Sequence, residues 1–413
     1  MNAPVHYDAA LEEAKLTARA LPLHEIDVSD PLLFQNDLYY PYFERLRQED
    51  PVHYCKDGKY GSFWSVTKFK DIMTVETHPG IYSSDAKLGG ISITDRPMEF
   101  RRASFISMDP PRHDDQRKAV SPIVAPANLN NMADVIRGRV CKVLDSLPRD
   151  EPFDWVKLVS IELTTLMLTT IFDFPEADRH KLTYWSDVAT QDVNAGGLVD
   201  SEEKRLEILT EALRVFTAMW HERASRPPAY DLISMLAHAE ATKNLVNDPA
   251  EFLGNLTLLI VGGNDTTRNS MSGGLWAMCK NPSEWAKLRA DPSLVTSLVP
   301  EIIRWQSPIV HMRRTAVADA ELGGKQIKKG DKVVMWYISG NRDEDTIDRP
   351  NEFIVDRARP RHHLSFGFGV HRCVGNRLAE MQLITLWEEI LKRFPKIELL
   401  EEPERIYSLH PWH

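Results

Sequence analysis

The chain has 413 residues, of which 43% are hydrophobic, and its formal net charge at pH 7 is -10. A nucleic-acid-binding domain is normally basic, so this acidic balance argues against nucleic acid as a partner. The longest strongly apolar run, residues 256–261, is far shorter than the roughly 20 residues that span a bilayer. The N-terminus also lacks the basic and apolar segments of a secretory signal, so no transmembrane anchor is expected.

No internal repeat, low-complexity segment or Pro-rich or Gly/Ser-rich linker interrupts the sequence, which predicts a single domain over residues 1–413. The four cysteines lie far apart in a long chain without an export signal. Reduced thiols in a cytoplasmic protein are therefore expected, rather than a disulfide framework. These cysteines are Cys55, Cys141, Cys279 and Cys373.

The first predicted elements in chain order are a hairpin and three helices. Residues 52–69 place β-branched and aromatic residues on both sides of Asp57-Gly58, which predicts a hairpin with its turn there. Apolar residues then recur with helical spacing, and the second and third helices end before prolines. The three predicted helices cover residues 158–173, 202–224 and 250–280.

A second β region is predicted over residues 314–339, with turns at Gly323-Gly324 and at residues 329–331. A helix is expected from Val374 to Trp387. The predicted helices cover more of the sequence than the predicted strands, which indicates a mainly α-helical fold with small β-sheets attached.

The helix predicted over residues 250–280 has an unusual centre, LLIVGGNDTTRNS, residues 258–270. Each glycine should cost about 1 kcal/mol relative to alanine. Glycines let a flat ligand lie against the backbone, and a threonine that bonds to a preceding carbonyl can open the helix and admit a water. The alternative is a helix end with an Asn-Asp turn, but the apolar pattern resumes at Met271, Leu275 and Trp276.

The segment FGFGVHRCVG, residues 366–375, places Cys373 just before a predicted helix, with His371 and Arg372 beside it. A helix N-terminus and nearby positive charge stabilise a thiolate, and the glycines permit a tight loop around it. The alternative is that Cys373 is a small buried hydrophobic residue, the commoner role of a lone cysteine.

The same ten residues resemble the cysteine-ligand loop of the cytochrome P450 superfamily at every constrained position. The resemblance implies the P450 fold, a helical prism enclosing a haem, with Cys373 as the axial thiolate ligand of the iron of haem b (iron protoporphyrin IX). Two further family marks occur in the expected order. Glu301 and Arg304 match a structural ion pair, and residues 262–266 match the glycine-acid-threonine patch of the long helix over the haem.

By this resemblance, cationic side chains pair with the two haem propionates. His113 and Arg117 are four residues apart, which places them on one helix face. Arg313 and Arg314 are alternative candidates for a third propionate-binding residue. The distance in sequence to Asp319 and Glu321 favours Arg314. The alternative for each is a solvated surface charge. The implied cofactor-binding residues are His113, Arg117, Gly262, Arg314, Phe366, His371 and Cys373.

Longer strings, including SLVPEIIRWQSP, HMRRTA and MWYISGNRD, are similar to the soluble bacterial alkane and fatty-acid terminal hydroxylases of this superfamily. The implied reaction is hydroxylation of a linear aliphatic chain, mainly at its terminal carbon, with O2. Asp265 is the expected proton relay, and Thr266 is the hydroxyl that holds a water. Relatives continue into a closing strand where this sequence ends at residues 409–413. The expected substrate walls are Leu88, Ile91, Ile93, Leu258, Val261, Ile309 and Val310.

The resemblance also implies electron transfer from a [2Fe-2S] ferredoxin and an NAD(P)H-dependent ferredoxin reductase. The chain is too short to include a fused flavin reductase, and it has no iron-sulfur cysteine cluster. A local basic face can attract an acidic partner. The arginines that predict such a face within residues 354–377 are Arg357, Arg359, Arg361, Arg372 and Arg377.

Three alternative functions stay open. One is a P450 that hydroxylates another apolar substrate, the second is a haem sensor without turnover, and the third is a peroxide-driven peroxygenase or decarboxylase. A sensor does not need an acid and a threonine above the iron, and the peroxide-driven enzymes usually lack this pair. Asp265 and Thr266 therefore argue for O2 activation.

Overall fold

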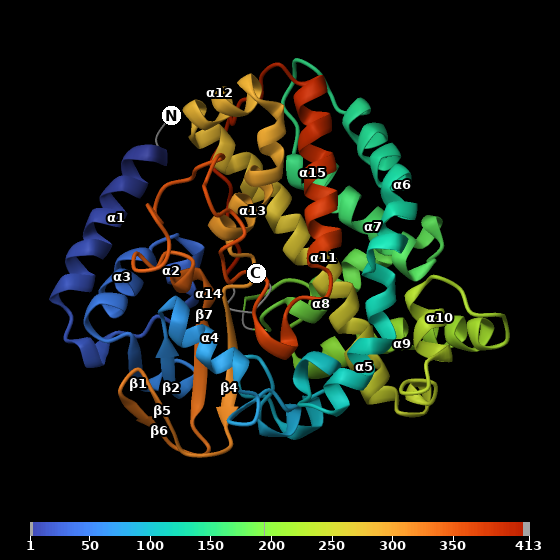
Figure 1. The fold of residues 1–413 in the computed structure, drawn as a ribbon, viewed down its shortest axis with the longest axis horizontal. Coiled ribbons are helices and arrows are strands. Elements are labelled where there is room, and N and C mark those ends of the chain that lie inside the picture. The colour runs from blue at the N-terminus through green and yellow to red at the C-terminus, as the bar shows by residue number, and fades with distance from the viewer. Residues whose placement is uncertain (1–2, 194, 408–413) are drawn as a thin grey trace.

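Helices make up most of the molecule, and the strands gather on one side of it (Figure 1). The computed structural model describes residues 3–193 and 195–407. This arrangement confirms the mainly α-helical fold with small sheets. The described helices are α1 (Ala3–Ala20), α2 (Pro31–Gln35), α3 (Tyr40–Glu49), α4 (Phe69–Thr77), α5 (Arg112–Val120), α6 (Pro126–Asp145), α7 (Glu162–Phe172), α8 (His180–Thr190), α9 (Glu202–Ala224), α10 (Leu232–His238), α11 (Pro249–Lys280), α12 (Pro282–Ala290), α13 (Val295–Gln306), α14 (Tyr337–Gly340) and α15 (Asn376–Arg393).

Seven strands are described, and five of them form one sheet. The seven are β1 (Val52–Gly58), β2 (Gly61–Val66), β3 (Tyr82–Ser83), β4 (His311–Ala316), β5 (Ala320–Leu322), β6 (Lys325–Ile327) and β7 (Lys332–Trp336). The larger sheet has the order β1-β2-β7-β4-β3, in which β2 and β7 are parallel and the other pairs antiparallel. Strands β5 and β6 form a separate antiparallel pair.

The predicted first hairpin is present as β1 and β2, but its turn lies later in the chain than expected. Asp57 and Gly58 belong to β1, where the register shifts between Cys55 and Gly58. Asp57 has φ +54°, in the left-handed region that aspartate tolerates better than most residues. The Asp-Gly signal therefore marks a bulge, and Lys59-Tyr60 connects the strands.

The second β region agrees better with its prediction. Gly323 and Gly324 connect β5 to β6, and both have positive φ. Residues 329–331 precede β7, as predicted. The expected continuation to residue 339 is wrong, because Tyr337 begins the short helix α14.

The longest helix, α11, contacts α7, α8, α9, α12, α13 and α15. Asp248 caps its start by accepting a hydrogen bond from the N–H of Glu251, and proline follows at the first helical position. Gly254 permits close packing, because an added Cβ would lie 2.2 Å from the carbonyl oxygen of Ala103. The helix is continuous through residues 258–270, as predicted.

Other predicted helices are present with small differences at their ends. Helix α9 covers the predicted residues, with Ser201 capping its start. A π-helical segment, Val156–Ile161, precedes α7, so the α-helix begins at Glu162. Helix α15 begins at Asn376, two residues later than expected, and continues to Arg393.

Two buried apolar clusters hold α11 in place. One joins α11 to the helices before it and includes Trp185, Phe216 and Phe252. The other joins α11 to α13 and α15 and includes Ile302 and Trp387. Burying one large apolar side chain stabilises a fold by about 1.5–3 kcal/mol, so the clusters fix α11 and α15 firmly. Within residues 3–193 and 195–407, no helix has the length and hydropathy to cross a membrane.

Candidate active site

Cys373 lies just before the first turn of α15. Backbone N–H groups of Gly375 and Asn376 donate hydrogen bonds toward its sulfur, and the guanidinium groups of Arg117 and Arg372 are close enough to act on it electrostatically. Desolvation by the surrounding protein raises the pKa of the Cys373 thiol, and these four groups oppose the increase, although the residue is exposed to the cavity that it lines. The sulfur borders a cavity, so it is available to a ligand. This environment suits a thiolate that binds a metal ion.

Two glycines and one carboxylate determine the path of the cysteine loop. Gly367 and Gly369 have φ values of +64° and +63°, in the left-handed region. A Cβ on Gly369 would also lie 2.3 Å from the carbonyl oxygen of Glu76 on α4. The Glu76 carboxylate accepts hydrogen bonds from the N–H of Phe368 and from the hydroxyl of Tyr337. The loop is thereby anchored to α4 and α14.

A cavity lies between the cysteine loop and α11, and we call it the thiolate cavity. An added Cβ at Gly262 would meet no atom within 4 Å, so bare helix backbone borders open space there. A flat group can lie against α11 at this point, as the sequence predicts. The predicted site residues that line the thiolate cavity are His113, Arg117, Leu258, Gly262, Thr266, Ile309, Phe366, His371 and Cys373.

Two histidines in the cavity wall have ring nitrogens that lack partners among the described residues, namely His113 Nε2 and His371 Nδ1. Their other nitrogens lie 2.7 Å from Asp114 Oδ1 and 2.9 Å from Ser84 Oγ, respectively. The ring centroids are 4.3 Å apart. Burial lowers the pKa of His371 to about 2, and the nearby cationic groups, Arg314 first among them, shift it in the same direction.

Arg314 lies behind the cavity wall. Its Nη2 atom is 3.9 Å from Oε1 of Glu76, which lines the thiolate cavity. Its competitor Arg313 points elsewhere, because it pairs with Asp95 and donates a hydrogen bond to the carbonyl oxygen of Leu88. This placement favours Arg314 over Arg313 as the residue near the cavity. Arg314 lies beside the carboxylate of Glu76, which sequence reasoning missed.

The residues of the thiolate cavity fit the haem that the resemblance implies. The Cys373 sulfur would serve as a ligand of the iron, and the bare backbone at Gly262 leaves room for a flat ring. The unpaired imidazole nitrogens of His113 and His371 can donate to anionic propionates, and Arg117 adds a cation in the same wall. Among the described residues, no group of three or more His, Cys, Asp or Glu could hold a separate metal ion.

Thr266 and Asp265 have different surroundings although they are adjacent on α11. Thr266 lines the thiolate cavity, and its hydroxyl donates to the carbonyl oxygen of Gly262 at 3.0 Å, the local bond that the sequence predicts. Asp265 is fully buried and accepts hydrogen bonds from Asn264 Nδ2 at 3.0 Å and Ser186 Oγ at 3.3 Å. Burial raises the pKa of Asp265 to about 6.

Arg268 connects Asp265 with the surface, and sequence reasoning did not identify it. Its guanidinium lies 2.8 Å from Asp265 Oδ1 and 3.0 Å from Asp187 Oδ1. The exposed fraction of the side chains rises from 0% at Asp265 through 12% at Arg268 to 37% at Asp187. The i, i+3 spacing of Asp265 and Arg268 was a usable signal. No local pattern indicates Asp187, which comes from α8.

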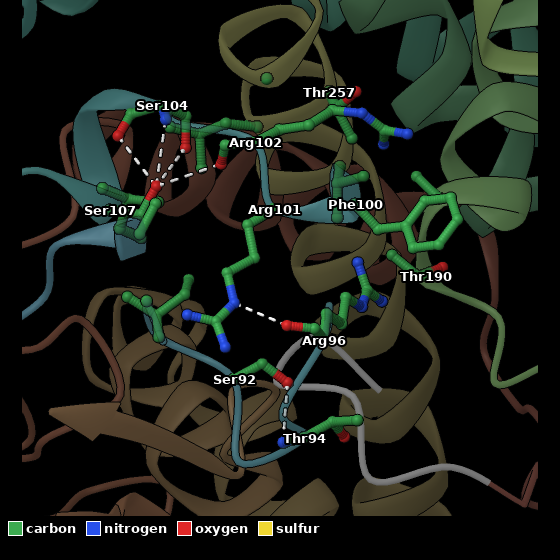
Figure 2. A pocket seen from close by; sticks show the side chains of 18 of the residues that line it. Ser92, Thr94, Arg96, Phe100, Arg101, Arg102, Ser104, Ser107, Thr190 and Thr257 are labelled. Atoms are coloured by element: carbon green, nitrogen blue, oxygen red, sulfur yellow. Dashed lines mark hydrogen bonds between the residues drawn. The ribbon is translucent and has the colours of Figure 1, made fainter. Parts of the chain in front are cut away.

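A second cavity adjoins the first, and we call it the arginine pocket after Arg96, Arg101 and Arg102 in its wall (Figure 2). The expected substrate walls divide between the two spaces. Ile91 and Val261 line the arginine pocket, Ile309 lines the thiolate cavity, and Leu258 lines both.

Three expected wall residues line neither cavity, which corrects the sequence-based assignment. Val310 and Ile93 pack in a buried core cluster with Trp336, because their segments face the helices that cover the sheet. The Leu88 side chain is 43% exposed. Apolar character alone could not separate these core and surface positions from cavity walls.

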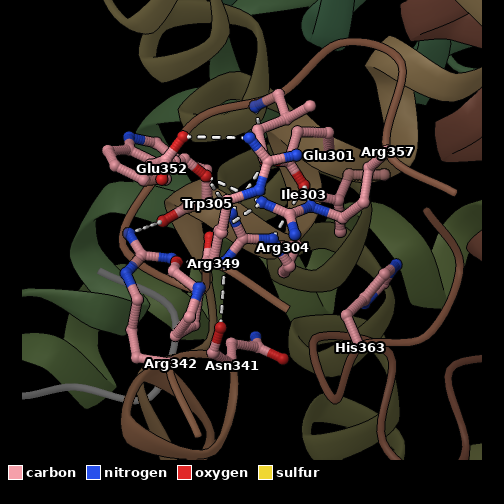
Figure 3. A network of polar contacts seen from close by, with 12 residues as sticks. Glu301, Ile303, Arg304, Trp305, Asn341, Arg342, Arg349, Glu352, Arg357 and His363 are labelled. Carbon is pink, nitrogen blue, oxygen red and sulfur yellow. Dashed lines mark hydrogen bonds and ion pairs between the residues drawn. The ribbon is translucent and has the colours of Figure 1, made fainter. Parts of the chain in front are cut away.

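Glu301 and Arg304 form a fully buried ion pair, with 2.7 Å between Arg304 Nε and Glu301 Oε2 (Figure 3). Arg304 also donates to the carbonyl oxygens of Asn341 and Glu352, at 2.9 and 3.0 Å. Arg357 joins the same carboxylate at 2.8 Å. Arg357 is therefore part of this buried network and not of an exposed basic face, which corrects the sequence-based interpretation.

Comparisons with known proteins agree with this geometry. A family model described as Cytochrome P450 matches residues 198–409. Linalool 8-monooxygenase of Pseudomonas putida is 35% identical over 390 residues, which cover 92% of this chain and 95% of that protein. Steroid C26-monooxygenase of Mycolicibacterium smegmatis is 32% identical over 377 residues, or 88% of this chain and 86% of that protein.

Two solved structures show higher identity. Cytochrome P450-153 from Novosphingobium aromaticivorans has a TM-score of 0.88 and 44% identity. CYP153D17 from Sphingomonas sp. PAMC 26605 has a TM-score of 0.86 and 47% identity. Each match covers 94% of this chain and 96% of the solved chain. The similarity therefore extends over nearly the whole fold.

Proposed function

The chain belongs to the cytochrome P450 superfamily, whose members are haem b monooxygenases that receive electrons from redox partners, and from this premise we propose its substrate and its electron donor. The proposed reaction is hydroxylation of linear aliphatic chains, alkanes or fatty acids, mainly at the terminal carbon. The resemblance to bacterial terminal hydroxylases supports this substrate class.

The observation that carries the proposal is a pair of adjacent cavities along α11, one of which Cys373 lines. Ile106 and Leu258 line both cavities, so the thiolate cavity and the arginine pocket are adjacent at these residues. Gly254 lines one cavity and Thr266 the other, and twelve residues of helix between them rise about 18 Å. An extended chain fits such a space with one end toward Cys373.

When bound, the haem supplies O2 activation and C–H oxidation. The chain's own residues would hold it: Cys373 would supply the thiolate ligand, and His113, Arg117 and His371 would supply donors for the propionates. Terminal C–H bonds are stronger than their methylene neighbours, so selectivity for the terminus must come from shape. Ile309 lines the thiolate cavity, and we propose that its bulk narrows the space near Cys373 so that the methyl end of the substrate enters first.

In the proposed reaction, Asp265 delivers protons together with its ion-pair partner Arg268. A carboxyl with a pKa of about 6 changes its protonation near neutral pH, so it can both take up and release a proton. Arg268 and Asp187 connect this carboxyl with the protein surface. The Thr266 hydroxyl, bonded to the helix backbone, offers a fixed site for a water in the thiolate cavity.

The proposed electron donor is a [2Fe-2S] ferredoxin reduced by an NAD(P)H-dependent ferredoxin reductase. Four of the five arginines near the cysteine loop are exposed, which leaves a basic face for an acidic partner. They are Arg359, Arg361, Arg372 and Arg377. We also place the protein in the cytoplasm, and none of its four cysteines forms a disulfide within the described chain.

A second candidate is hydroxylation of a branched or polycyclic apolar substrate. The names of two relatives favour it, because one is a linalool monooxygenase and the other a steroid monooxygenase. This candidate uses the same thiolate cavity and the same proton route. It differs in the shape of the molecule that the joined cavities accept.

Product analysis separates the candidates. The holoenzyme is supplied with ferredoxin, reductase and NADH, and the products from dodecane and dodecanoate are identified. Mostly terminal alcohol is expected. Products dominated by omega-1 to omega-3 alcohols would contradict terminal selectivity. Turnover of linalool or a steroid without product from either linear chain would favour the second candidate, and absence of any product would favour a haem sensor. The expected influence of the ending at residues 409–413 lies outside the described residues.

A further inference from the structure

The arginine pocket has an excess of positive charge in its wall. Three of its lining residues are arginines, and its described lining includes no Asp or Glu (Figure 2). Hydroxyl groups add further hydrogen-bond donors to the wall. These hydroxyl residues are Ser92, Thr94, Ser104, Ser107, Thr190 and Thr257.

Two of the three arginines already have partners. Arg101 donates to the carbonyl oxygens of Arg96 and Lys87, at 2.6 and 3.1 Å. Arg96 lies 3.6 Å from Glu202, but that carboxylate also pairs with Arg205. Burial lowers the pKa of Arg96 most, and the charges of Glu202 and Asp192 oppose the decrease, so Arg96 already has carboxylate neighbours.

Arg102 differs from both, because its guanidinium forms no hydrogen bond or ion pair with any residue of the described ranges. Its side chain packs on α11, where its Cβ lies 3.3 Å from the position a Cβ on Gly254 would take. Burial lowers the pKa of Arg102, and the charge of Arg96 adds to the effect. A partly buried guanidinium normally has an anionic partner, but no described carboxylate forms an ion pair with Arg102, and Glu202 acts on it only through its charge at longer range.

We propose that the arginine pocket binds the carboxylate of a free fatty acid, with Arg102 as the main contact and Arg96 as a second cation. This inference rests on the proposed function and narrows it from linear chains in general to chains that carry a carboxylate. The apolar residues Ile106, Leu258 and Val261 contact the chain between the two ends, and its methyl end reaches the thiolate cavity.

The chemistry of the contact favours a carboxylate. A guanidinium presents a planar fork of N–H donors that matches two carboxylate oxygens, and charge-assisted bonds of this kind are stronger than neutral ones. An alkane offers nothing to this wall and leaves Arg102 unpaired. A neutral alcohol accepts at most a weaker hydrogen bond.

Equilibrium binding to the holoenzyme tests the inference without turnover. Dissociation constants for dodecanoate, its methyl ester and dodecan-1-ol are measured by calorimetry with the wild type and with Arg102→Gln, Arg102→Lys and Arg214→Gln. Wild type should bind dodecanoate best. Arg102→Gln should weaken dodecanoate binding roughly 10- to 100-fold and change binding of the two neutral ligands less than about twofold. Arg102→Lys should recover part of the affinity for dodecanoate.

Arg214 is an exposed arginine of α9, so Arg214→Gln controls for the change in net charge and should leave all three constants unchanged. Equal loss of affinity for acid, ester and alcohol in Arg102→Gln would overturn the inference, because it would indicate a structural role. Unchanged affinity for dodecanoate would overturn it too. If wild type binds all three ligands equally and still forms terminal alcohols, only this inference fails. If it binds none of them and forms no product from dodecane either, the proposed function fails with it.

Discussion

Asp265 combines complete burial with an ionisable side chain, so its protonation should be visible in stability. Its pKa is raised from 3.8 to about 6, first because burial penalises the charged form. The stabilisation from holding this proton is fully present below pH 3.8 and is lost as the pH rises through about 6. The change is on the order of 3 kcal/mol at most, because one pKa unit corresponds to about 1.4 kcal/mol.

The measurement compares wild type with Asp265→Asn, whose side chain has the same shape and no charge to lose. The thermal midpoint of the wild type should fall relative to that of the variant as the pH rises from about 4 to about 6. In infrared spectra of the folded protein, a protonated-carboxyl band absent from the variant should fall to half its intensity near pH 6, the pKa of the folded state, and disappear above it. A constant difference between the two midpoints would show that Asp265 is already ionised at low pH.

At the scale of single residues, local spacing decided what could be predicted. The bond from Thr266 to Gly262 follows from an i, i−4 relation, and Arg268 could have been found from its i, i+3 relation to Asp265. Glu76 could not, because it meets the cysteine loop nearly 300 positions away in the sequence. The role proposed for Arg102 likewise depends on the contact between its loop and Gly254 of α11, which the sequence alone does not show.

Helix α4 is joined to the cysteine loop by the carboxylate of Glu76, and Glu76→Gln tests this anchor. A glutamine amide has one neutral acceptor oxygen and one NH2 donor, so the Tyr337 hydroxyl would have to accept instead of donate, and the charge-assisted bond from the Phe368 N–H and the ion pair with Arg314 would be lost. The free energy of unfolding should fall by about 1–3 kcal/mol. Hydrogen exchange at the N–H of Phe368 should accelerate in the holoenzyme.

Glu211→Gln, on the exposed side of α9, is the matched control and should change neither quantity. Faster exchange throughout α4 and α15 alike would indicate general destabilisation. Unchanged exchange at Phe368 would show that the glycine geometry of the loop suffices without this carboxylate.

The ends of helices and strands could be predicted where a local sequence pattern occurs in only one kind of structure. Helix α9 begins after the capping residue Ser201 and ends before two prolines, so its bounds were confirmed. The signal at Asp57-Gly58 has two meanings, since a positive φ serves a bulge as well as a turn. The assignment of Val310 failed for a related reason, because an apolar residue after a helix fits a core and a cavity equally well.

For the whole molecule, the fold class and the family were predictable because the cysteine loop and the helix patch are local in sequence. The single-domain organisation stays a prediction. The basic face was predictable only in part, because a count of arginines does not distinguish exposed from buried ones. Arg357 belongs to the Glu301 network, and Arg361 pairs with Glu380 at 2.9 Å.

The distribution of charge over the molecule determines how a redox partner approaches. The net charge is -10, so an acidic ferredoxin is repelled on average and must be attracted locally. Arg377 is exposed on the first turn of α15, close to Cys373 in sequence, and no described carboxylate pairs with it. Arg377→Glu should therefore slow reduction of the haem by ferredoxin several-fold at low salt.

The dependence of the reduction rate on ionic strength distinguishes a loss of electrostatic attraction between the partners from structural damage to the protein. Exposed charges act over about 30 Å at 0.01 M salt and about 3 Å at 1 M, so the rates of wild type and Arg377→Glu should converge as salt increases. Stopped-flow absorbance of the haem gives the rate of reduction, with dodecanoate binding measured in parallel and expected to stay unchanged. Arg214→Glu reverses one exposed charge on α9 and should leave the rate near that of wild type. A deficit in Arg377→Glu that persists at high salt would mean that the substitution disturbs the start of α15 and, with it, the N–H groups that face the Cys373 sulfur.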